Sequence, residues 1–280
     1  MKTQNVGQTS HGTLLSLNKT VAAPAVSAAP DTLDQKPNAL LTRDNPKLLK
    51  GQKIGVMSAV LHLAPHKLSG ANVCPHATAG CIDACLNTAG RGGIIKTGET
   101  TNQIQTARIR RTRFFRNNRP AFDKMLAREI TAFVKYARKN GFTPAVRLNG
   151  TSDIPWEKMP FNGHKNVFAA FPDVQFYDYT KWPIRLRGTL PKNYNLTFSL
   201  AESNDQNAAD ALAAGVNVAA VFRVSKSVRY PATYRFNGSV YPLIDGDETD
   251  ARFTDSGGSI IALRAKGRGR YDKTGFVRDL

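Results

Sequence analysis

The chain has 280 residues, of which 41% are hydrophobic and 21% are charged. This composition supports a sizeable folded core and excludes disorder throughout, and the apolar runs fall short of the roughly 18 residues needed to cross a bilayer. The 39 Lys and Arg residues against 21 Asp and Glu give a net charge of +18, which is typical of a protein with a polyanionic partner, most often nucleic acid.

Residues 1–37 are rich in Ala, Ser, Thr and Pro without periodicity, which predicts a flexible N-terminal arm. This stretch has no continuous apolar run of signal-peptide length, so we expect a cytosolic protein with no membrane association. A single domain is expected over residues 38–280. Its first predicted element is a strand or extended apolar segment within residues 53–65, ended by Pro65.

All the cysteines of the chain lie within twelve residues, in the segment CPHATAGCIDAC at residues 74–85. Their spacing is C-x6-C-x3-C, and a helix through Cys81 and Cys85 would place both thiols on one face, one turn apart. Cys74 would reach the same point from the preceding loop, and His76 is the nearest candidate for a fourth ligand. In a reducing cytosol, such a cluster predicts a metal site rather than a disulfide.

Two kinds of metal centre fit this cluster, and both remain open. A Cys3His zinc site would be closed and structural. A 4Fe-4S cluster held by three cysteines would leave one iron open to a substrate or cofactor, and the absence of a fourth cysteine from the chain favours this alternative. A third interpretation, that the thiols are small buried apolar groups, is disfavoured because the whole cysteine complement is packed so closely.

Two basic helices are predicted after the cysteines. Apolar side chains recur at helical spacings in residues 100–118 and more clearly in residues 119–141, where Pro120 suits the first turn and Gly141 the C-terminal stop. Residues 86–147 contain fourteen Lys or Arg against three acidic residues, whereas an ordinary solvated face mixes both signs. The helical segment 104–140 is therefore a candidate nucleic-acid-binding element, although at least one of Phe114 and Phe115 is expected in the core.

Beyond Gly141 the sequence changes to short β-rich runs. Strands are predicted within residues 143–150, 173–180, 194–201, 216–224, 239–246 and 258–266, with a helix over residues 203–215. The runs are nearly continuous in apolar residues, which is typical of strands covered on both faces. This alternation predicts an α/β fold with a parallel sheet, as a partial or complete βα (TIM-like) barrel, with an open doubly wound sheet as the alternative.

Polar residues cluster where several predicted strands end, and in βα barrels such loops hold the active site. The candidate pocket residues are Asn149, Ser152, Asp153, Asp178 and Glu202. The segment from Asn149 to Asp153 is equally well explained as a turn followed by a helix N-cap. The acidic run at residues 245–250 is expected to pair with Arg252 or Arg264 rather than to bind magnesium.

Two segments combine basic and aromatic residues, as in proteins that bind phosphates and stack bases. They are RIRRTRFFRNNR and RAKGRGRYDK. DNA, RNA and a nucleotide all remain open as the ligand. The candidate phosphate-binding residues are Arg108, Arg110, Arg111, Arg113, Arg116, Arg119, Lys266, Arg268 and Arg270.

Several motifs, in the same order along the chain, resemble the gene product 88 family of tailed phages over roughly residues 38–272. They are LTRDNPKLLKG, NVCPHATAGCIDACLNTAGRG, RTRFF, VRLNGTSDIPWE, IDGDETDARF and LRAKG. This resemblance implies a phage protein and therefore the cytoplasm of the infected host cell. Three cysteines ahead of a run of βα units are also distantly similar to the radical S-adenosylmethionine enzymes, whose cysteines are usually spaced more closely, and this similarity makes S-adenosylmethionine a candidate cofactor.

These features together predict a phage iron-sulfur-cluster enzyme, similar to the radical S-adenosylmethionine enzymes, that acts on nucleic acid or a nucleotide. Its 4Fe-4S cluster would be held by Cys74, Cys81 and Cys85. The alternative is a non-catalytic nucleic-acid-binding protein with a structural Cys3His zinc site.

Overall fold

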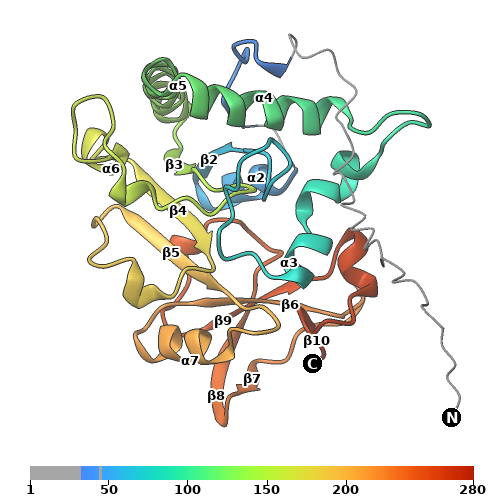
Figure 1. The fold of residues 1–280 in the computed structure, drawn as a ribbon. Helices are drawn as coiled ribbons and strands as arrows, with labels where there is room; N and C mark the ends of the chain where they lie inside the picture. The colour runs from blue at the N-terminus through green and yellow to red at the C-terminus, as the bar shows by residue number, and fades with distance from the viewer. Residues whose placement is uncertain (1–32, 44–45) are drawn as a thin grey trace, which may run out of the picture.

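The computed structural model describes residues 33–43 and 46–280 (Figure 1). Most of the predicted flexible arm, residues 1–32, lies outside the described residues. In the described remainder of that arm, Leu33 is buried against Ala64 and Ile109, so packing onto the domain begins before residue 38. No helix in these two described ranges is both long and apolar enough to cross a membrane.

A ten-stranded, mostly parallel sheet forms the centre of the fold (Figure 1). The strand order is β1-β2-β3-β4-β5-β6-β9-β8-β7, and β10 pairs with β6 off this path. The strands are β1 (Leu41–Thr42), β2 (Val56–Leu61), β3 (Thr143–Arg147), β4 (Gln175–Thr180), β5 (Tyr194–Ser199), β6 (Val218–Phe222), β7 (Thr233–Phe236), β8 (Ser239–Asp245), β9 (Ile260–Arg264) and β10 (Val277–Arg278). Every strand segment predicted from the sequence contains one of them.

The α/β class with a parallel sheet is confirmed, but the sheet is not closed. Its two ends are β1 and β7, which are both antiparallel to their neighbours and do not pair with each other in the described part of the chain. A complete barrel would need these two edge strands to pair with each other. The short antiparallel edge strands therefore leave an open sheet instead of a complete barrel.

The helices are α2 (Pro46–Gly51), α3 (Ala79–Asp83), α4 (Gln103–Asn117), α5 (Arg119–Lys139), α6 (Val167–Ala170) and α7 (Asp205–Ala213). The predicted basic helices are confirmed as α4 and α5, and the predicted helix over residues 203–215 as α7. The side chain of Asn118 caps α5 by accepting a hydrogen bond from the amide of Ala121. Gly141 ends the helical segment with φ +76°, a backbone conformation that favours glycine.

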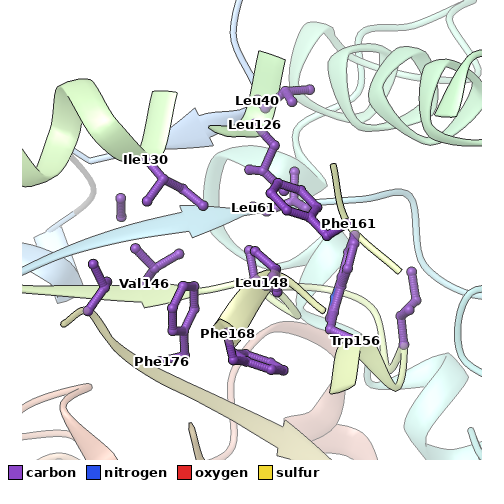
Figure 2. Packing of buried hydrophobic residues seen from close by; sticks show 14 of the residues in the cluster. Leu40, Leu61, Leu126, Ile130, Val146, Leu148, Trp156, Phe161, Phe168 and Phe176 are labelled. Carbon is purple, nitrogen blue, oxygen red and sulfur yellow. The ribbon is translucent and has the colours of Figure 1, made fainter. Parts of the chain in front are cut away.

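The larger part of the core lies between α5 and the strands β2 to β4. Leu126 and Ile130 of α5 pack over Leu61 and Val146, and all four side chains are buried (Figure 2). Phe114 of α4 is also buried in this cluster, as predicted for at least one of the two phenylalanines. A second cluster lies between α7 and strands β5, β6 and β9. On β2, β3 and β4 the alternate residues Val56, Ala145 and Tyr177 are buried in a separate cluster with Ala251, so these strands are covered on both faces and their sequences are nearly continuous apolar runs.

The carboxyl ends of the parallel strands β2, β3, β4, β5, β6, β9 and β8 lie at one edge of the sheet, where β5 and β6 also separate. β5 pairs only with Val218 and Ala219 at the start of β6, whereas β10 pairs with Val221 and Phe222 at its end. The last strand of the chain therefore lies against the end of β6 at this edge. Figure 1 shows β10 and α3 next to β6.

Candidate cysteine-lined site and basic pocket

A cavity of about 220 Å³ lies at the carboxyl ends of the parallel strands, and we call it the Cys cavity. Its wall contains all three cysteines together with residues from the ends of β3, β4, β5, β6 and β9. The structure therefore brings the cysteines together with three of the candidate pocket residues. The polar and aromatic residues of the wall include Arg147, Asn149, Ser152, Asp153, Tyr179, Lys181, Arg264, Lys266 and Phe276.

The cysteines come from the connection that follows β2, the first parallel strand. Cys74 lies in a loop, and Cys81 lies in the short helix α3, whose N-terminus is capped by Thr78. α3 ends at Asp83, so Cys85 lies just beyond it in an extended conformation. The prediction of one helix through both cysteines is therefore only partly met, but both thiols still line the same cavity.

The surroundings of the sulfur atoms combine burial with backbone donors. The amide of His66 donates to Cys74 Sγ over 3.4 Å, and the amide of Asn87 donates to Cys85. Burial raises the pKa of the Cys74 thiol to about 12 and also raises the pKa of Cys85. Within the described ranges, no three His, Cys, Asp or Glu side chains stand close enough together to hold one metal ion.

His76, the candidate fourth ligand, lies away from the wall of the Cys cavity. Its ring meets the ring of Trp182 edge-on, with 4.4 Å between centroids. This aromatic contact fixes the imidazole against the segment that follows β4. The structure does not bring His76 to the three thiols.

Glu202 contacts the helix that carries Cys81 instead of the cavity itself. Its Oε1 atom accepts a hydrogen bond from the amide of Gly80, and its Oε2 atom accepts one from the hydroxyl of Thr78, each over 2.7 Å. Thr78 in turn caps the amide of Cys81. Glu202, which follows β5, therefore positions the N-terminus of α3.

Asp178 lies fully buried beneath the cavity wall. Its Oδ1 atom accepts the amide hydrogen of Asn149 over 2.7 Å, and the hydroxyl of Tyr194 donates to Oδ2 over 3.1 Å. Burial raises the pKa of Asp178 to about 7, although nearby Arg147 and these donors favour its charged form. Asp178 therefore positions Asn149 from below.

Asn149 and Ser152 form a turn that is bonded to itself. Asn149 Oδ1 accepts hydrogen bonds from the Ser152 hydroxyl over 2.9 Å and from the Ile154 amide over 3.0 Å. The turn is present, but its side chains cap no helix, because the next helical element, η4 (Trp156–Lys158), has Pro155 at its N-cap position and no side-chain cap. Both side chains also lie on the cavity wall. Asn149 and Ser152 can therefore hold the turn together and also contact a ligand in the Cys cavity.

Asp153 connects the cavity wall to a buried ion cluster that the sequence analysis missed. The fully buried guanidinium of Arg187 binds both carboxylate oxygens of Glu157, at 2.8 and 2.7 Å, and lies 3.7 Å from Asp153 Oδ1. The amide of Lys181 donates to Asp153 Oδ2 over 2.7 Å. These residues are separated along the chain and form no local motif, so the sequence carries no signal for their grouping.

Most of the arginines of α4 and the start of α5 that are predicted to bind phosphate are engaged within the protein. Arg119, for example, pairs with Asp123 over 2.7 Å and lies over the rings of Phe115 and Trp156. Arg116 is exposed. Arg108, Arg111 and Arg113 donate to Asn87 Oδ1, the Ala39 carbonyl and Asp34, respectively.

A larger pocket of about 940 Å³ lies beside the Cys cavity, and we call it the basic pocket. Arg264 and Lys266 line both spaces. Two of the predicted phosphate-binding residues, Lys266 and Arg270, therefore line this pocket, whereas Arg268 pairs with Asp83 of α3. The charged residues of the pocket are Lys50, Arg223, Lys226, Arg264, Lys266, Arg270, Asp245, Asp247 and Glu248.

Comparison with protein families matches the chain to the family model described as Gene product 88, over residues 39–280. The chain belongs to the gene product 88 family. The phage family predicted from the sequence motifs is thereby confirmed. Comparisons with curated proteins and with solved structures gave no match.

The acidic loop of this gene product 88 protein pairs with basic side chains, as predicted. Arg264 lies 3.2 Å from Asp245 and 3.5 Å from Asp247, and Lys266 lies 2.8 Å from Asp247. Arg252 pairs with Asp255 instead. The aspartates therefore fix the two cations that separate the basic pocket from the Cys cavity.

Proposed function

We propose that this protein is a phage enzyme that binds an iron-sulfur cluster through Cys74, Cys81 and Cys85 and acts on nucleic acid or a nucleotide. The proposal depends on one observation: the whole cysteine complement lines a single cavity at the carboxyl ends of parallel strands. Active sites of α/β proteins lie at this edge of the sheet. The order of strand, cysteine loop and further parallel strands supports the similarity to radical S-adenosylmethionine enzymes.

The arrangement of the thiols favours a cluster over a single zinc ion. Sulfurs that share one zinc lie within about 4 Å of one another. No such ready group of ligand side chains is present among residues 33–43 and 46–280. In an iron-sulfur cluster each cysteine binds a different iron, so the sulfurs surround a larger volume. The backbone donors to Cys74 and Cys85 also fit, since amide hydrogen bonds to sulfur tune such clusters.

The remaining wall residues supply groups that bind and orient a polar ligand. Lys181 offers positive charge for a carboxylate or phosphate, while Asn149, Ser152 and Asp153 offer hydrogen-bonding groups. Arg147 also lines the wall, but its guanidinium already pairs with Asp250 over 3.1 Å. A bound 4Fe-4S cluster would supply one-electron chemistry at the iron that has no cysteine ligand. S-adenosylmethionine, which carries a carboxylate and an amine, is compatible with this wall.

Anaerobic reconstitution with iron and sulfide tests the proposal. We expect a brown protein with about four irons per chain, and iron binding that is lost in Cys74→Ala, Cys81→Ala and Cys85→Ala. His76→Ala is the matched variant and should keep its iron, because His76 packs on Trp182. A colourless protein that binds one zinc and loses it in His76→Ala would instead support the structural zinc site.

A further inference from the structure

We propose that the basic pocket binds the backbone phosphates of single-stranded nucleic acid and directs the strand toward the Cys cavity. This inference deepens the proposed function and rests on it for the reaction, whereas the binding step itself does not need the cluster. The site keeps Arg270 from the predicted phosphate-binding residues and lies at the edge of the sheet, away from the predicted arginines of α4 and the start of α5.

Some cationic side chains of the basic pocket are not ion-paired and are available to bind a ligand. Its wall has six cationic and three acidic side chains. Arg223, Arg264 and Lys266 each pair with an aspartate. Lys226 and Arg270 are exposed and form no ion pair with any described residue. Two unpaired cations on one wall suit two neighbouring phosphates of a nucleic-acid backbone.

The basic pocket and the Cys cavity lie side by side, with Arg264 and Lys266 in the wall between them. Arg264 is held in place by Asp245 and by the ring of Tyr230, over which its guanidinium lies at 4.4 Å. A strand bound in the basic pocket would therefore lie next to the wall of the Cys cavity.

An exposed aromatic residue favours a single strand over a duplex or a free nucleotide. Tyr271, which follows Arg270, is 81% exposed. The bases of a single strand are free to stack on an exposed ring beside unpaired cations. The bases of a duplex already stack on one another and are not available to such a ring. No aromatic side chain lines the basic pocket itself, so a free nucleotide would find no ring for its base there. The bases of a strand would contact Tyr271 outside the pocket.

The arginines of α4, and Arg119 at the start of α5, are less suited to this role. Arg108, Arg111, Arg113 and Arg119 already donate to other parts of the protein, so a phosphate would have to displace those partners. Lys226 and Arg270 need no such exchange. Binding is therefore expected to depend on the basic pocket more than on the helix.

Fluorescence anisotropy measures the affinity of the protein for labelled single-stranded DNA and RNA oligonucleotides of about 12 nucleotides. The double variant Lys226→Ser/Arg270→Ser should bind single strands about tenfold more weakly, and the slope of log affinity against log salt should fall by about 1.4. The matched variant Lys124→Ser/Arg128→Ser removes two exposed cations from α5 and should change affinity by less than about twofold. Unchanged melting temperatures check that both variants fold.

Tyr271→Ala tests the stacking contact. We expect it to weaken single-strand binding by about fivefold or more and to leave duplex binding within about twofold. The proposal is overturned if the wild type does not bind single strands, if it prefers a duplex, or if both double variants weaken binding equally.

The two proposals can fail separately. A protein that passes these binding tests but takes up no iron would contradict the proposed enzyme and leave the phosphate site in place. If the cluster forms and Lys226→Ser/Arg270→Ser binds like the wild type, only the phosphate site is wrong. DNA and RNA affinities that differ would identify the nucleic acid.

Discussion

Asp178 is a buried acid that supports the wall of the Cys cavity through its hydrogen bond to Asn149. It accepts hydrogen bonds from the Asn149 amide and the Tyr194 hydroxyl, and the guanidinium groups of Arg147 and Arg187 lie near enough to favour its charged form. Complete burial opposes that charge more strongly, so its pKa rises to about 7. A carboxyl with this pKa makes the stability of the fold depend on pH.

We predict that Asp178 lowers the stability of the protein as pH rises from about 4 to about 7. Its pKa in the folded protein is above its ordinary value, so the folded state binds the proton more tightly than the unfolded state in this window. Relative to Asp178→Asn, which does not titrate, the wild type should therefore lose on the order of 2 kcal/mol of unfolding free energy between about pH 5 and about pH 8. Urea unfolding at the two pH values measures this difference.

The exposed Asp173 provides the control, since Asp173→Asn should follow the wild type across the same range. A constant difference between the wild type and Asp178→Asn at both pH values would show that Asp178 does not change protonation in this window.

The cysteines and the buried ion cluster differ in how far the sequence predicts them. Cys74, Cys81 and Cys85 are close along the chain, so their grouping is visible without a fold. Arg187 and Glu157 are thirty residues apart and meet only because the segments after β3 and β4 fold together. The closeness of His76 to Cys74 along the chain makes it a candidate ligand, but its ring packs against Trp182, which no local pattern indicates.

At the scale of elements, the helix α3 is held between the end of β5 and the C-terminal segment. Glu202 binds its N-terminus from one side. On the other side, a β-carbon on Gly80 would stand 2.2 Å from Thr274 Oγ1 and 2.7 Å from Phe276 Cβ. α3 has only five residues, so these contacts and not its own hydrogen bonds determine where Cys81 lies.

Removing the Glu202 carboxylate is predicted to release α3. Glu202→Ala leaves the Gly80 amide and the Thr78 hydroxyl without their acceptor, and should lower the unfolding free energy by about 2 kcal/mol. Faster alkylation of Cys81 and lower iron binding should accompany this loss. Glu202→Gln keeps an acceptor for Gly80 and should lose less than half as much. Equal behaviour of the two variants would contradict the positioning role.

Gly80→Ala is predicted to destabilise the protein by about 1–3 kcal/mol, although alanine normally favours a helix. The added methyl group would overlap Thr274 and Phe276 and push α3 away from the C-terminal segment. Gly269→Ala is the matched control, because its β-carbon would meet Ala84 Cβ at an ordinary 3.4 Å. Thermal unfolding of both variants measures the difference, and equal melting temperatures would contradict close packing at Gly80.

Helices and strands can be predicted where the sequence pattern that specifies them lies within the element itself, and cannot be predicted where the element depends on contacts with distant residues. α4 and α5 are visible from their apolar spacing, Pro120 and Gly141, and the apolar strand runs are equally clear. β10 has two residues and pairs with β6 more than fifty residues earlier, so nothing in its sequence predicts its place. The helix expected through Cys85 ends at Asp83 because the chain turns there to begin the next element.

On the scale of the whole molecule, the parallel sheet places both candidate binding sites at one edge. The Cys cavity and the basic pocket both lie at the carboxyl ends of strands and share Arg264 and Lys266. The high positive charge of the composition predicts a polyanionic ligand. The place where that ligand binds depends on which cations are already ion-paired within the protein, as Arg119 is, and composition does not show this. The open sheet likewise depends on the edge strands β1 and β7, of which neither was predicted.

Anomalous diffraction at the iron edge, from crystals of the anaerobically reconstituted protein, tests the central claim most directly. We predict iron density within the Cys cavity, with Cys74, Cys81 and Cys85 each bonded to iron at about 2.3 Å and one iron without a protein sulfur ligand. Absence of iron from this cavity, or a single zinc ion held there by the three thiols and His76, would contradict the account.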